Sequence, residues 1–76
     1  MTYYIGYFIR PHIWSKPRFV VIAETRNSFI ARFIQSSYNE HNIENGSENR
    51  VELLTADELP EIVTYSADFP AVLAAS

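Results

Sequence analysis

Two histidines and the carboxylates near them are the first residues to consider for metal or acid–base chemistry. His41 and Glu44 are three residues apart, a spacing that one face of a helix could present together. A metal site needs a further protein ligand, and the sequence offers none nearby and contains no cysteine. We therefore expect no metal, and we interpret His41 as a residue that interacts with the C-terminal end of a helix dipole. His12, between Pro11 and Ile13, is expected in a loop.

Nucleophilic and phosphate-binding motifs are absent from the sequence. No serine lies in a Gly-x-Ser-x-Gly or Ser-x-x-Lys pattern, and two glycines are too few for a dinucleotide-binding or phosphate-binding loop. Asp57 and Glu58 have the placement of helix-start residues. A small-molecule pocket of ~300 Å³ or more would be a large hollow in so short a chain. We expect a non-enzymatic protein with no cofactor, although a catalytic site shared between subunits of an oligomer stays open as an alternative.

The aromatic and charged side chains divide the chain into two unlike halves. Residues 1–38 contain five basic residues against one acid and hold nine of the eleven aromatic residues, whereas residues 39–76 contain eight acids against one arginine. The net charge of −3 is therefore the sum of a first half at +4 and a second half at −7. The simplest interpretation is an apolar first half that supplies the core and a solvated acidic second half. The alternative is a molecule with one basic, aromatic face and one acidic face.

Two strands are predicted in the first third of the chain. Residues 2–10 are rich in Tyr, Ile and Phe and stop at Pro11, and residues 18–24 form a β-branched run between charges. Gly6 is predicted to mark a bulge or a close approach of two backbones. The two strands are expected to form an antiparallel hairpin, with residues 11–17 as the loop. This loop either presents Trp14 to solvent or folds it back over the sheet.

A helix is predicted over residues 27–41. Residues 25–27 supply helix-start chemistry, and Asn45 with Gly46 supplies a stop signal. Apolar residues then recur at helical spacing. The stripe expected to face the sheet consists of Phe29, Ile30, Phe33, Ile34, Ser37, Tyr38 and His41. The residues expected on the solvent side are Arg32, Gln35, Ser36, Asn39 and Glu40.

The last third of the chain is predicted to contain a short strand and a second helical element. Residues 50–54 have strand character, with Val51 and Leu53 on one face. Thr55 and Glu58 then have the spacing of a capping box, and Pro60 interrupts the pattern that follows. The result is either one distorted turn or a helix that restarts at Pro60 and continues to about Tyr65. We expect residues 1–70 to form one domain and residues 71–76 to be a loose C-terminal tail.

These elements define an α+β protein in the order β-β-α-β-α. The simplest assembly is a small three-stranded sheet with one long helix packed on one face. Because both faces of the first two strands are largely apolar, the second face needs a cover. The candidates are the short second helix with residues 69–73, a second copy of the chain, or a different protein. Association is favoured because the tail offers few large apolar groups, so we expect a homodimer or a binder of another protein.

The leading functional prediction is a protein–protein interaction module that uses Tyr4, Phe8 and Trp14 as aromatic anchors. By analogy of size and charge alone, such a module is typical of a small inhibitor or adaptor that a phage or another mobile element encodes against a larger host protein. We expect a cytoplasmic protein without a membrane contact, since no charge-free stretch approaches the length of a membrane span.

Two further predictions concern charged partners. Tyr4 and Phe8, together with Arg10, Lys16 and Arg18, could form a stacking platform with a basic rim for a single-stranded nucleic acid. The overall acidity of the chain makes this the less favoured alternative. The acids of the second half could instead steer the protein to a basic groove and imitate nucleic acid. That acidic surface consists of Glu40, Glu44, Glu48 and Glu52.

Overall fold

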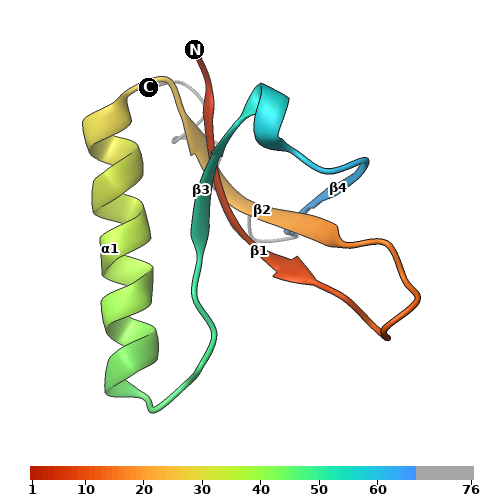
Figure 1. The fold of residues 1–76 in the computed structure, drawn as a ribbon. Helices are drawn as coiled ribbons and strands as arrows, with labels where there is room; N and C mark the ends of the chain where they lie inside the picture. Colours follow the sequence, from red (N-terminus) through yellow and green to blue (C-terminus); the bar gives the residue numbers. More distant parts are fainter. Residues whose placement is uncertain (67–76) are drawn as a thin grey trace.

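The computed structural model describes residues 1–66, in which four strands form one mixed sheet with a long helix on one face (Figure 1). The elements are β1 (Tyr3–Ile9), β2 (Arg18–Thr25), α1 (Ser28–Glu44), β3 (Glu52–Thr55), the 3-10 turn η1 (Ala56–Glu58) and β4 (Ile62–Tyr65). The strand order is β3-β1-β2-β4. β1 is antiparallel to β2 and β3, and β4 is parallel to β2. The predicted α+β class is confirmed, while the predicted strand number and element order are not.

The hairpin of β1 and β2 is the centre of the sheet. Its ladder runs from Tyr3 opposite Thr25 to Ile9 opposite Arg18, with a register shift between Ile5 and Gly6. Ile5 pairs with Ala23 and Gly6 with Val21, so Ile22 is the extra residue of a β-bulge. A Cβ on Gly6 would lie 2.0 Å from the carbonyl oxygen of Val20. The two structural features predicted as alternatives for Gly6, a bulge and a close approach of two backbones, are both present.

The ends of α1 follow the predicted capping chemistry. The Asn27 side chain accepts hydrogen bonds from the backbone N–H groups of Phe29 and Ile30, at 2.9 and 3.1 Å. These bonds satisfy two of the donors that a helix start leaves free. The helix continues past His41, where the prediction ended, to Glu44. Gly46 then takes a φ of 71°, a left-handed conformation that glycine adopts without strain.

The face that α1 turns to the sheet differs from the predicted stripe. Ala31 and Ile34 are buried, whereas Phe29 and Phe33 are 78% and 71% exposed. The predicted stripe is therefore right for Ile30 and Ile34, which pack in or against the core, but its centre is rotated by roughly one residue. The core cluster comprises Ile5, Ala23, Ala31, Ile34 and Val51.

Hydrogen bonds to the chain entering β3 give the physical reason for this rotation. Asn39 accepts from the backbone N–H of Val51 at 2.8 Å and donates to the Val51 carbonyl at 3.3 Å. Gln35 donates to the same carbonyl at 3.2 Å. The two amide side chains provide hydrogen-bond partners for the backbone groups of Val51, which is buried. They therefore face the sheet, although they were predicted on the solvent side.

After β3 the structure has the distorted turn that was one of the two predicted outcomes, and the helix predicted as the other outcome is absent from residues 56–66. The Thr55 backbone N–H donates to the Glu58 carboxylate at 2.8 Å, which fits the predicted capping box, but only the three-residue turn η1 follows. Residues 62–65 form β4 instead of the helix predicted to restart at Pro60. Proline cannot donate a backbone hydrogen bond, and the sequence Ile-Val-Thr-Tyr that follows is rich in β-branched and aromatic residues.

The second sheet face is covered within the chain at its centre. Phe19 and Val21 point away from α1 and are fully buried. The connection from β3 to β4 crosses from one edge of the sheet to the other, on the side opposite α1 (Figure 1). The need for an external cover is therefore smaller than predicted. The predicted cover by residues 69–73, the domain boundary at residue 70 and the tail lie outside the described residues.

Candidate interaction site at the end of the hairpin

The β1–β2 hairpin extends beyond the strand that flanks it. β3 pairs only with Tyr3, Tyr4, Ile5 and Gly6 of β1, while the ladder between β1 and β2 continues to Ile9. On the side away from β2, residues 7–9 of β1 therefore have no strand partner among residues 1–66. Figure 1 shows the hairpin turning away from the chain that leads into β3. We call residues 7–9 the open edge.

Large apolar side chains are exposed around the open edge. Trp14, in the hairpin loop, is 87% exposed, and Ile13 beside it is also exposed. Phe8 is 46% exposed and contacts Phe19 edge-to-face, with ring centroids 5.0 Å apart. Clustered exposure of this kind marks interaction surfaces more often than single exposed apolar residues do. The structure thus realises the predicted alternative in which the loop presents Trp14 to solvent.

The basic residues at this end of the sheet are not equivalent. Lys16 forms an ion pair with Glu61 at 2.7 Å, which joins the hairpin loop to the segment before β4. Both side chains are largely exposed, so the pair contributes little to stability. Arg10 and Arg18 are exposed and form no ion pair with any residue that the structure describes. The predicted basic rim is therefore reduced to two free arginines.

The predicted aromatic anchors divide between two places. Phe8 and Trp14 lie at the hairpin end with Arg10, Lys16 and Arg18, as the hairpin prediction requires. Tyr4 is at the other end of β1, where it is half-buried and pairs with Glu24 and Leu54. The register shift at Gly6 separates it from Phe8.

The predicted acidic surface is spread over several elements. Glu40 and Glu44 are one turn apart near the end of α1, Glu48 follows the helix, and Glu52 begins β3. All four are exposed. Because α1 ends at Glu44 and the chain turns at Gly46, the four-residue spacing of these glutamates does not continue along one face of a helix.

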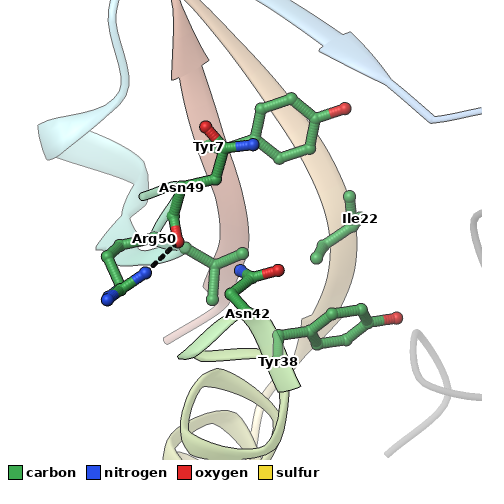
Figure 2. Close-up of a pocket in the computed structure, with 7 residues that line it drawn as sticks. Tyr7, Ile22, Tyr38, Asn42, Asn49 and Arg50 are labelled. Carbon is green, nitrogen blue, oxygen red and sulfur yellow. Dashed lines mark hydrogen bonds between the residues drawn. The ribbon is translucent and has the colours of Figure 1, made fainter. Parts of the chain in front are cut away.

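Sequence reasoning missed a cavity of about 280 Å³ between α1 and the sheet. Figure 2 shows Tyr7 and Ile22 on the sheet side and Tyr38 and Asn42 on α1. Asn49, Arg50 and Val51 complete the lining. We call this hollow the helix–strand cavity. Its position depends on where the chain returns after α1, so no local motif in the sequence indicates it.

Arg50 contributes to the lining of the helix–strand cavity, and its exposed guanidinium is turned away from Ile22 and Tyr38 (Figure 2). One terminal nitrogen of its guanidinium donates to the carbonyl oxygens of Ser47 and Asn49, at 2.8 and 2.6 Å. The second of these bonds is drawn in Figure 2. These bonds fix the position of the charge, and no acid among residues 1–66 forms an ion pair with Arg50. The cavity thus combines apolar walls with amide groups, and the Arg50 charge lies beside it.

The titratable groups with shifted pKa values lie outside the open edge and the lining of the helix–strand cavity. The Thr55 hydroxyl lowers the pKa of Asp57, and the Thr55 backbone N–H lowers the pKa of Glu58. Partial burial, followed by the nearby Glu24, raises the pKa of Tyr65.

Residues 1–66 contain no group of three or more side chains placed to hold a metal ion. His41 contacts the Asn45 side-chain amide at 2.9 Å, so its polar neighbour is a helix-end residue, as expected for its place in the last turn.

Comparison with known proteins gave no match to a family model, a curated protein or a solved structure. Within residues 1–66, no helix combines the length and the apolar character that crossing a bilayer requires. The functional argument therefore rests on the geometry of the hairpin end and the helix–strand cavity.

Proposed function

We propose that this protein is a non-enzymatic interaction module that binds a larger protein through the end of its β1–β2 hairpin. The observation that carries this proposal is the combination of a strand edge at residues 7–9, which no strand within residues 1–66 pairs with, and the exposed side chains of Phe8 and Trp14. Large aromatic side chains are the commonest anchors of protein interfaces, and clusters of them on a small domain mark binding surfaces. An inhibitor or adaptor encoded by a mobile element remains the biological setting that fits a module of this size.

Affinity capture from the native host, with mass spectrometry of the retained proteins, tests this proposal. Trp14→Ser and Phe8→Ser should each remove the specific partner, because they delete the exposed anchors. Phe33→Ser is the matched control, since Phe33 is also a largely exposed aromatic residue but lies on the outer side of α1. If Phe33→Ser removes the partner while Trp14→Ser and Phe8→Ser retain it, the interface is on α1 and the proposal is wrong.

Binding of a single-stranded nucleic acid is the second candidate. It is favoured by one observation: Arg10 and Arg18 form no ion pair with any of residues 1–66 and lie at the same end of the hairpin as Phe8 and Trp14. Stacking on aromatic rings within a basic rim is the common way to bind single strands. Fluorescence anisotropy with labelled oligothymidine and oligouridine at low salt tests it, because binding through phosphates must weaken as salt rises. No change in anisotropy at low salt would end this candidate.

A further inference from the structure

The open edge and the helix–strand cavity are continuous, because Tyr7 belongs to both. Its backbone is part of the three-residue edge that has no strand partner in the described part of the chain, and its side chain lines the cavity. An extended segment laid along this edge would pair with the backbone of β1 and pass the mouth of the cavity. Alternate side chains of such a segment would point toward the cavity side of the sheet.

The cavity has the dimensions and lining of a pocket for one large side chain. Its volume of about 280 Å³ is large enough for more than a small side chain such as that of alanine. Ile22, Tyr38 and Val51 give it apolar walls. Asn42 and Asn49 add side-chain amides near its mouth. In strand addition, the backbone pairing supplies affinity, and pockets for alternate side chains supply specificity.

Three arginines near the open edge favour an acidic occupant, and one acid, Glu52, also borders the edge opposite Gly6. Arg10 follows the edge in sequence, Arg18 pairs with Ile9, and Arg50 lies beside the cavity. None of these arginines forms an ion pair within the described part of the chain. A partner with carboxylates beside its apolar residues would gain both steering and specificity from this arrangement.

A second copy of the chain fits this edge less well. β3 already occupies Tyr3–Gly6, so two copies of β1 could pair over residues 7–9 alone. A contact between this edge and the acidic end of α1 on another copy would be asymmetric, and contacts of that kind tend to form open chains.

We propose that residues 7–9 of β1 accept an extended acidic segment of another protein as an added strand, with one large apolar side chain in the helix–strand cavity and a carboxylate on Arg50. This proposal rests on the proposed function and specifies the partner of the same site.

Selection of random linear peptides on the immobilised full chain tests the inference. The selected peptides should share a large apolar residue flanked by Asp or Glu. Arg50→Glu should weaken their binding about tenfold or more and should shift the selection toward Lys and Arg. Arg32→Glu is the matched control, because it reverses an exposed charge on α1, and it should leave binding unchanged. Circular dichroism and urea denaturation establish that both variants are folded.

Backbone pairing is tested on the peptide and leaves the protein intact. Methylating alternate backbone nitrogens of the best peptide removes the donors that an added strand uses, so binding should fall at least about tenfold in one of the two methylation patterns. Amide signals of residues 7–9 should shift in the NMR spectrum when the unmodified peptide binds.

The remaining outcomes overturn the inference. It is wrong if no peptide is selected, if the selected peptides carry no acids, or if Arg50→Glu leaves their binding unchanged. It is also wrong if light scattering shows a dimer whose formation shifts the same amide signals, since the occupant would then be a second copy. If the lysate partner depends on Trp14 while the peptides fail, the proposed function stands and strand addition at this edge does not.

Discussion

The two ends of the β1–β2 hairpin are built from the same strands but differ in what surrounds them. At the packed end, Tyr3–Ile5 lies between two strands, and α1 covers Ile5. At the open end, residues 7–9 have a strand on one side only among the residues that the structure describes, and Phe8 and Trp14 are exposed. The bulge at Ile22 and the glycine at position 6 separate the two ends. We infer that side chains at the packed end mainly stabilise the fold, whereas those at the open end are free to bind a partner.

The largest expected effect is on stability at the packed end. Ile5→Ala removes a fully buried side chain from the core, so it should lower the free energy of unfolding by about 3 kcal/mol. Trp14→Ala removes a larger but exposed side chain and should change that free energy by less than about 0.5 kcal/mol. Urea denaturation measures both. Similar losses in the two variants would contradict the division between the ends.

The second effect concerns the boundary between the two ends. Gly6→Ala would place a Cβ against the Val20 carbonyl and should lower the free energy of unfolding by about 2.5 kcal/mol, because the two backbones must separate. Gly46→Ala is the control: its Cβ meets no atom within 4 Å, and its positive φ should cost only about 1 kcal/mol. Urea denaturation again gives the values. A Gly6→Ala variant as stable as Gly46→Ala would show that the strands do not need this close approach.

A third prediction concerns the attachment of α1 to β3. Asn39→Ala removes two hydrogen bonds to Val51 and leaves its backbone groups partly unsatisfied, so the free energy of unfolding should fall by about 1.5 kcal/mol. Ser36→Ala, an exposed change one turn earlier, should have almost no effect. Thermal and urea denaturation test the difference. If Asn39→Ala is neutral, these bonds do not determine which face of α1 meets the sheet.

The smallest expected effect is a pH dependence at η1. The pKa values of Asp57 and Glu58 are lowered in the folded protein, so their contribution to stability is present above the ordinary carboxyl range and is lost as the pH falls through the lowered values. Both carboxylates are fully exposed, which keeps the effect small. Thr55→Val removes the hydroxyl that donates to Asp57 at 2.6 Å. An NMR titration should therefore give a higher midpoint for Asp57 in the variant, and an unchanged midpoint would contradict this cause.

Local sequence signals predicted the hairpin and the start of the helix correctly. Gly6 indicated the close backbone approach, and Asn27 caps α1 as helix-start chemistry requires. Because one loop joins β1 directly to β2, the same reasoning placed Phe8, Trp14 and the nearby arginines at one end of the hairpin. These features depend on residues that are close in sequence, so propensity and spacing were sufficient to find them.

Features that depend on distant contacts could not be predicted in this way. Phe29 and Phe33 are more apolar than Gln35 and Asn39, yet the amides face the sheet because Val51 needs hydrogen-bond partners. β4 was predicted as a possible helix because the capping box preceding it is also a helix signal. The helix–strand cavity depends on how residues 49–51 return to the sheet, and nothing in the local sequence specifies that path.

The strand order has a consequence for how the chain is made. β1 and β2 occupy the centre of the sheet, but both strands that flank them come from residues 52–65. During synthesis on the ribosome, the hairpin is therefore complete before either neighbour has emerged. Both of its edges are open to pairing with other chains during that interval, which makes the nascent protein most prone to aggregation before residue 65 is available.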